Sequence, residues 1–178
     1  MSVSRFAVIC SLALGCALAG CAAPAGDGHG VSAPVTPALS PQQMQAAVEA
    51  AGGRDDREVL VQPLRDPQVE DLREQAQQSL RTGDHAAAAE SLNQALMIGE
   101  PEPGVLQERA EVALLQADFE RAETLSRRAL DLGSKVGPLC RRHWATIEQA
   151  RLARGFKDDA ASARVQIDAC TVAGFDRM

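Results

Sequence analysis

Residues 69–98 read VEDLREQAQQSLRTGDHAAAAESLNQALMI, and this stretch decides the fold. It holds two patterns with helical spacing, separated at residues 82–84 by Thr-Gly-Asp, which favours a turn over a helix interior. Leucines recur at helical spacing, with small residues between them at Ala76 and Ala88. The stretch therefore predicts two helices that pair closely through small side chains.

The same pattern returns 34 residues later. Six positions of the first stretch have a counterpart at this offset, and the turn falls in the same place. The six pairs are Leu72 and Leu106, Ala76 and Ala110, Asp84 and Asp118, Ala88 and Ala122, Ala95 and Ala129, and Leu96 and Leu130. The turn Gly83-Asp84-His85 recurs as Ala117-Asp118-Phe119. So many matches at a single offset indicate an internal repeat of helix pairs.

A third, degenerate unit follows at residues 139–174. Its turn, Arg154-Gly155-Phe156, comes four residues later than a strict period predicts, so its first helix should be about one turn longer. Its second helix carries apolar residues at helical spacing from Phe156 to Cys170. Terminal repeats are commonly atypical because they cap the stack.

A 34-residue period with small residues at these sites resembles the tetratricopeptide repeat. The resemblance implies an all-α superhelix of about three helix pairs over residues 68–176, with repeats at 69–102, 103–136 and 139–174. The proline that often closes such a repeat is replaced by Glu100 and Ser134, although Pro101, Pro103 and Pro138 lie close by.

The resemblance also implies a concave groove, lined by the first helix of each pair, that binds an extended or helical peptide. Repeat alignment predicts that six first-helix residues line this groove, although they are equally read as ordinary exposed helix positions. They are Arg73, Gln77, Arg81, Gln107, Glu111 and Leu115.

Residues 1–20 have a single arginine, an apolar stretch and a small-residue exit, as in a secretory signal peptide. The exit Leu18-Ala19-Gly20-Cys21 resembles the lipobox of bacterial lipoproteins. That resemblance implies acylation of Cys21, which becomes the mature N-terminus and a stable membrane anchor. Ala22 after the cysteine points to the outer membrane, with the protein facing the periplasm. The alternative is an ordinary signal peptide in which Cys21 is incidental.

Residues 21–67 form the next segment, which is rich in Pro, Gly and Ala over its first half. That half has almost no apolar periodicity and predicts a flexible tether. Ser40-Pro41 can cap and begin a short helix that ends at Gly52-Gly53.

Cys140 and Cys170 lie fifteen residues on either side of Gly155. An antiparallel hairpin brings both to one level, where a disulfide can form in an exported protein. Free thiols are an alternative. So is a metal site built on Cys140 and His143, for which the chain offers no clear fourth ligand. Arg141-Arg142 and Arg127-Arg128 are expected to be solvated, and Trp144 to pack in the core.

The composition excludes several classes of function. A net charge of −6 argues against nucleic-acid binding, and the chain has none of the common hydrolase, zinc-protease, P-loop or dinucleotide motifs. We therefore expect no enzyme, cofactor or metal. The chain is interpreted as a protein-interaction lipoprotein that scaffolds or pilots an envelope assembly, such as a pilus secretin or a protease adaptor. The alternative is a structural lipoprotein without a discrete partner.

Overall fold

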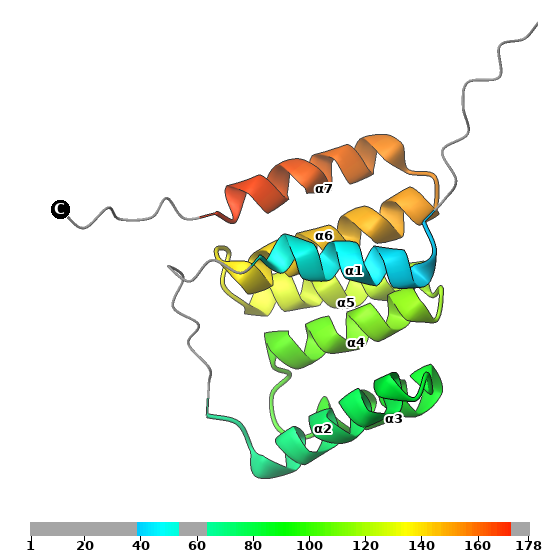
Figure 1. Ribbon diagram of the computed structural model, residues 1–178. Coiled ribbons are helices and arrows are strands. Elements are labelled where there is room, and N and C mark those ends of the chain that lie inside the picture. Colours follow the sequence, from blue (N-terminus) through cyan, green and yellow to red (C-terminus); the bar gives the residue numbers. More distant parts are fainter. Residues whose placement is uncertain (1–38, 54–63, 172–178) are drawn as a thin grey trace, which may run out of the picture. The chain divides into compact units, whose positions relative to one another are not determined.

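The computed structural model describes residues 39–53 and 64–171, which form α-helices and contain no strand (Figure 1). The signal segment, Cys21 and most of the tether lie outside the described residues. The helices are α1 (Pro41–Gly52), α2 (Pro67–Arg81), α3 (His85–Ala95), α4 (Pro103–Leu115), α5 (Phe119–Leu132), α6 (Pro138–Ala153) and α7 (Lys157–Ala169). None of these helices is both long enough and apolar enough to cross a membrane.

The predicted all-α stack of helix pairs is confirmed. Helices α2 and α3, α4 and α5, and α6 and α7 form successive hairpins, and α3 packs on α4 as α5 packs on α6. The arrangement is compatible with a superhelix of tetratricopeptide type.

Alanines set the distance between paired helices. Ala76 and Ala88 in the first pair, and Ala110 and Ala122 in the second, are each at most 1% exposed. Because a methyl group occupies so little space, the backbones of the two helices approach closely at these points. The 34-residue repetition of these alanines therefore repeats the geometry of the pair.

Each hairpin turns through one residue with positive φ. Gly83 (φ 77°) and Gly155 (φ 83°) fill this position in the first and third pairs, but Ala117 (φ 58°) fills it in the second. The left-handed conformation is disfavoured for a residue with a Cβ atom. The second turn therefore forms in spite of its sequence, and packing of α4 against α5 holds it.

Helix α1 is an addition to the repeat pattern. It begins at a capping box, in which Ser40 Oγ accepts from the backbone N–H of Gln43 and the Gln43 side chain accepts from the backbone N–H of Ser40. Met44 and Val48 are buried where α1 packs on α6 and α4. The helix expected after Ser40 is thus an ordered part of the domain.

The last hairpin differs from the others in two ways. Helix α6 has 16 residues, against 15 in α2 and 13 in α4, so the expected extra turn is present relative to α4 but not relative to α2. Cys140 and Cys170 are joined by a disulfide with their Cα atoms 5.8 Å apart, so neither thiol is available to a metal. Trp144 packs against the clusters on both sides of α6, around Ile147 and around Leu114.

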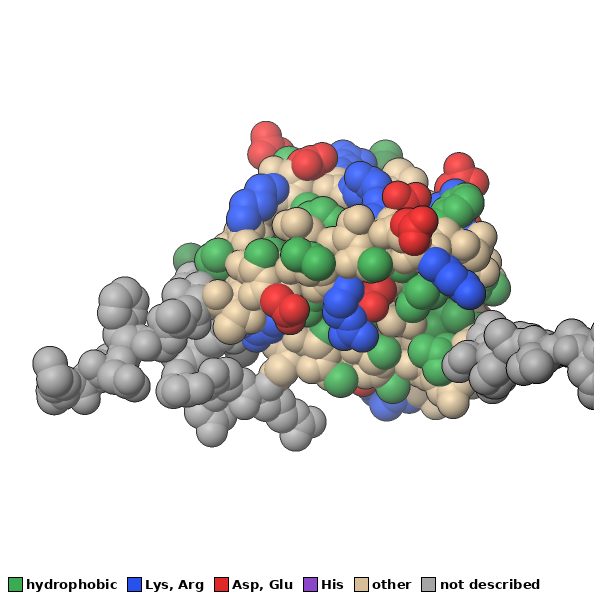
Figure 2. Space-filling model, turned by 90° about the horizontal axis from the view of Figure 1, so that it is seen from above, with side chains coloured by type: hydrophobic (Ala, Val, Ile, Leu, Met, Phe, Trp, Pro, Cys, Tyr) green, Lys and Arg blue, Asp and Glu red, His purple; other side chains and the backbone are tan. Residues whose placement is uncertain are grey.

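Charged side chains of both signs are interspersed on the face seen in Figure 2. Small hydrophobic side chains lie between them, and no broad field of one sign covers this face. Such a surface offers no electrostatic footprint for a polyanion.

Substitution of Ala117 by glycine should stabilise the protein. Glycine removes the cost of the left-handed conformation, and the gain exceeds the larger chain entropy of the unfolded state by about 0.5–1 kcal/mol. The free energy of unfolding, measured by urea denaturation, should rise accordingly. The matched control is Ala161→Gly at an exposed position inside α7, which should destabilise by about 1 kcal/mol. A loss of stability in both variants would contradict the proposed strain at Ala117.

Candidate partner-binding surface

Two of the six residues predicted to line the groove are buried. Gln107 is 0% exposed and Glu111 is 6% exposed. Gln107 Nε2 donates to Glu111 Oε1 at 2.8 Å and to Thr146 Oγ1 at 2.8 Å. The expectation that Gln107 and Glu111 meet a partner is therefore wrong in this structure, because both are used to join α4 to α6.

His143 completes this buried network. Its Nδ1 lies 2.6 Å from Gln107 Oε1, which can only accept, so the Nδ1–H donates. Its Nε2 is buried and has no hydrogen-bond partner. Burial, together with the positive charges of Arg142 and Lys135, lowers the pKa of His143 to about 4. His143 is therefore neutral and structural at physiological pH.

Arg142 supplies the charge that the network needs. Its Nη2 donates to both carboxylate oxygens of Glu111, at 2.6 and 2.7 Å. Burial raises the pKa of Glu111, and the nearby Arg142 opposes that shift. The ion pair thus keeps a deeply buried carboxylate satisfied.

The arginine pair of α6 also holds α1 in place. Arg141 is 8% exposed and donates to the carbonyl oxygens of Ala51 and Gly52, at 3.1 and 2.8 Å. A Cβ atom on Gly52 would lie only 3.0 Å from Cγ of Arg142. The expectation that Arg141 and Arg142 are solvated is therefore wrong, since they cap and support the end of α1.

Helix α1 consequently covers the α4–α6 part of the predicted groove. No segment among residues 39–53 and 64–171 covers the part near α2, where Gln77 and Arg81 are exposed and Leu115 is half-buried; this is called the open part below. Arg73 is half-buried and pairs with Glu108 of α4 and with Glu70. The hydrogen bond to Glu108 raises the pKa of Arg73. Arg73 therefore joins α2 to α4 and is not a freely exposed groove residue.

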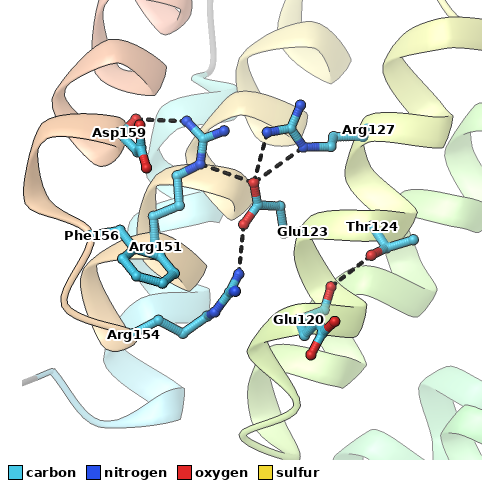
Figure 3. A pocket seen from close by; sticks show the side chains of 8 residues that line it. All are labelled: Glu120, Glu123, Thr124, Arg127, Arg151, Arg154, Phe156 and Asp159. Atoms are coloured by element: carbon cyan, nitrogen blue, oxygen red, sulfur yellow. Dashed lines mark hydrogen bonds and ion pairs between the residues drawn. The ribbon is translucent and has the colours of Figure 1, made fainter.

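A second surface feature lies at the junction of α5, α6 and α7, in a hollow of about 410 Å³ (Figure 3). Three arginines converge there on Glu123. Arg127 Nη2 and Arg151 Nε donate to its Oε1 at 2.9 and 3.0 Å, and Arg154 Nη1 donates to its Oε2 at 2.9 Å. The guanidinium of Arg154 also stacks over the ring of Phe156, 4.7 Å from its centre.

These charges are already paired within the protein. Burial raises the pKa of Glu123, but the hydrogen bonds from Arg127 and Arg151 outweigh it, and the pKa is lowered overall. A carboxylate held ionised by three guanidinium groups is a poor general base. The hollow therefore serves to clamp three helices together.

Nothing in the described part of the chain points to catalysis or metal binding. Groups of three or more side chains that could hold a metal ion do not occur in residues 39–53 and 64–171. His85, at the turn of the first pair, is half-buried, and its carbonyl oxygen accepts from Gln116 Nε2 at 3.1 Å.

Sequence reasoning missed the buried network and the docking of α1. One signal was present, because Gln107 and Glu111 are four residues apart on one helix face, as are Arg142 and Thr146. Two polar pairs on helices that lie one repeat apart can face each other across the stack. The docking of α1 had only the weak signal of Met44 and Val48.

Acid should weaken the fold through His143. The pKa of an unfolded histidine is near 6.5. Between pH 6.5 and about 4, His143 is therefore protonated in the unfolded chain but neutral in the folded protein. The free energy of unfolding should fall by about 2 kcal/mol from pH 7 to pH 5 on this account. Glu111, with its raised pKa, acts in the opposite direction. Urea denaturation of wild type and His143→Gln at pH 7 and pH 5 separates the contribution of His143 from that of the other groups. An equal loss of unfolding free energy in both proteins between the two pH values would contradict the assignment.

Comparison with known proteins identifies a related domain. No family model and no curated protein matches the chain. The solved structure of the globular C-terminal domain of P. aeruginosa LpoP is 36% identical in sequence, with a TM-score of 0.55. The similarity covers 59% of this chain and 99% of that domain. The helical domain of this chain therefore belongs to the same family as the globular C-terminal domain of LpoP.

Proposed function

We propose that the chain is a non-catalytic lipoprotein of the cell envelope whose helical domain binds and regulates a peptidoglycan synthase of the penicillin-binding class. The observation that carries the proposal is the 36% identity to the LpoP domain over 99% of its length. The choice of partner rests on this likeness.

The N-terminal segment supports the proposed location. Leu18-Ala19-Gly20-Cys21 places an acylation site directly after the apolar stretch, and Ala22 favours sorting to the outer membrane. The domain would then hang from the inner leaflet of that membrane into the periplasm, where a synthase can reach it. Acyl chains on one residue suffice for such an anchor.

The paired charges of the described surface support binding over catalysis. Glu111 and Glu123 are each neutralised by arginine, and Asp158 and Asp159 are exposed neighbours on α7. Adjacent helix residues point in different directions and do not form an acid–base pair. The partner-binding surface proposed here is the open part of the groove, formed by Gln77, Arg81 and Leu115.

Three other roles are open to a lipoprotein of this kind: piloting a pilus secretin, adapting a protease and a purely structural role. No observation in the described residues favours any of them over a synthase partner. A crosslinked capture from membranes separates them, because each predicts a different protein, or none, bound to this domain.

The membrane anchor should depend on Cys21. Cys21→Ser removes the acylation site, so the protein should move from the membrane fraction to the soluble periplasmic fraction. Fractionation followed by immunoblotting measures the shift, and Cys16→Ser within the signal is the matched control, which should leave the protein in the membrane. Retention of the Cys21→Ser protein in the membrane would show that another surface anchors it.

Partner binding should depend on Arg81. Arg81→Glu reverses an exposed charge at the end of α2, and we expect at least a tenfold loss of affinity, or about 1.4 kcal/mol. Biolayer interferometry against the periplasmic region of the cognate penicillin-binding protein measures it.

The matched control is Lys157→Glu, which reverses an exposed charge at the start of α7. It should bind like wild type, because exposed charges away from the interface contribute little. Equal loss in both variants would indicate non-specific electrostatics. Failure of the wild type to bind the synthase would overturn the choice of partner.

A further inference from the structure

Arg109 of α4 is a buried cation with almost no internal partner. The residue is 4% exposed. Its Nε donates to Asn93 Oδ1 of α3 at 2.9 Å, and its Nη1 is buried without a hydrogen-bond partner. No carboxylate of the described residues forms an ion pair with its guanidinium. A buried charge of this kind is costly unless an anion compensates for it.

Three less buried arginines of the domain each pair with a carboxylate. Arg73 pairs with Glu108, Arg142 with Glu111 and Arg151 with Glu123. Each of these pairs joins two helices. Arg109 is buried where these three are half-buried, and it lacks the carboxylate, so its position is not explained by stability of the isolated domain.

The surroundings of Arg109 provide space for an anion. It lines a hollow of about 490 Å³ where α3, α4 and α5 meet. Arg121 lines the same hollow. Burial first and the charge of Arg121 second lower the pKa of Arg109, and the negative charge of Asp118 only partly opposes them. Thr124 and Leu125 add a hydroxyl group and an apolar side chain to the wall.

The charges of the hollow limit what it can accept. Two arginines, Arg109 and Arg121, are balanced by Asp118 and Glu120. Asp118 is already engaged, because its Oδ1 accepts from the backbone N–H of Arg121 and its Oδ2 pairs with Arg121 Nε at 3.0 Å. The carboxylates of Asp118 and Glu120 would repel a multiply charged anion such as phosphate. A single carboxylate brings only one negative charge, and it can pair with the guanidinium of Arg109.

We propose that this hollow binds the carboxylate of an aspartate or glutamate side chain of the partner protein, with Arg109 as its ion-pair partner and Leu125 contacting an adjacent apolar residue. The identity of the partner rests on the proposed function, but the carboxylate chemistry does not. Arg109 lies two positions from Gln107, so the hollow opens on a different side of α4 from the network under α1.

Blocked tetrapeptides test the site without any assumption about the partner. The probe is Ac-Ala-Glu-Leu-Ala-NH2, with Ac-Ala-Gln-Leu-Ala-NH2 as the uncharged control and inorganic phosphate as the competing anion. Side-chain Nε–H resonances of the mature full-length chain, labelled with 15N, report on Arg109 directly. We expect a saturable shift of the Arg109 resonance at millimolar glutamate peptide and no saturable shift with the glutamine peptide or phosphate.

Arg109→Met provides the stability readout. It removes an unpaired buried charge and keeps an unbranched apolar stem, so the melting temperature should stay unchanged or rise. The matched control Arg73→Met breaks a paired contact and should lower the melting temperature. Affinity for the penicillin-binding protein should fall at least tenfold in Arg109→Met.

The outcomes separate the two proposals. No shift of Arg109 with the glutamate peptide, a stronger shift with phosphate, or a lower melting temperature in Arg109→Met overturns the carboxylate site. A peptide-induced shift without any binding of the synthase supports the site and overturns the choice of partner. Loss of synthase affinity in Arg109→Met, with the peptide-induced shift of Arg109 in wild type, supports both.

Discussion

The ion pair between Glu111 and Arg142 is the interaction on which the central part of the domain depends. Glu111 is almost fully buried, and its carboxylate is stable there because Arg142 and Gln107 both donate to it. Through Gln107 the same network reaches Thr146 and His143 on α6, and through the stem of Arg142 it supports Gly52 of α1. Removal of one member would leave the others buried and unsatisfied, which costs more than the pair contributes.

Arginine–carboxylate contacts join α2 to α4, α4 to α6 and α5 to α6. Alanine contributes little buried area, so an interface rich in alanine gains less from the hydrophobic effect than one built from leucine. The pairs Arg73–Glu108 and Arg151–Glu123 add directional contacts between α2 and α4 and between α5 and α6. They also leave the surface with few unsatisfied charges, which suits selective recognition of one partner.

The repeat architecture could be predicted from the sequence because it depends on local rules. Ala76, Ala110 and the turn residues repeat at a fixed offset, and each position needs only its own helix pair to explain it. The surface could not be predicted in the same way. Repeat alignment places Gln107 and Glu111 on the groove face, but their burial depends on Arg142, which lies 31 residues after Glu111.

The candidate site was predicted in part for the same reason. Gln77 and Arg81 are exposed, as expected, since no other segment of the described chain covers α2 there. Helix α1 covers the corresponding part of α4, and its pattern of short and polar side chains gave little indication of a docking face. Only two apolar side chains of α1, Met44 and Val48, are buried. Docking of such a helix can be recognised only once the surface of α4 and α6 that it packs against is known.

The disulfide has a consequence for the biogenesis of the protein. Cys140 and Cys170 close a loop across 30 residues, and a cross-link of this size destabilises the unfolded chain by about 3.6 kcal/mol in the chain-entropy model. Thiols stay reduced in the bacterial cytosol, so the chain of the exported lipoprotein proposed above would lack this constraint until it had crossed the inner membrane. The α6–α7 hairpin would then be least stable during export, when the chain has to be unfolded, and the disulfide would stabilise it only in the periplasm.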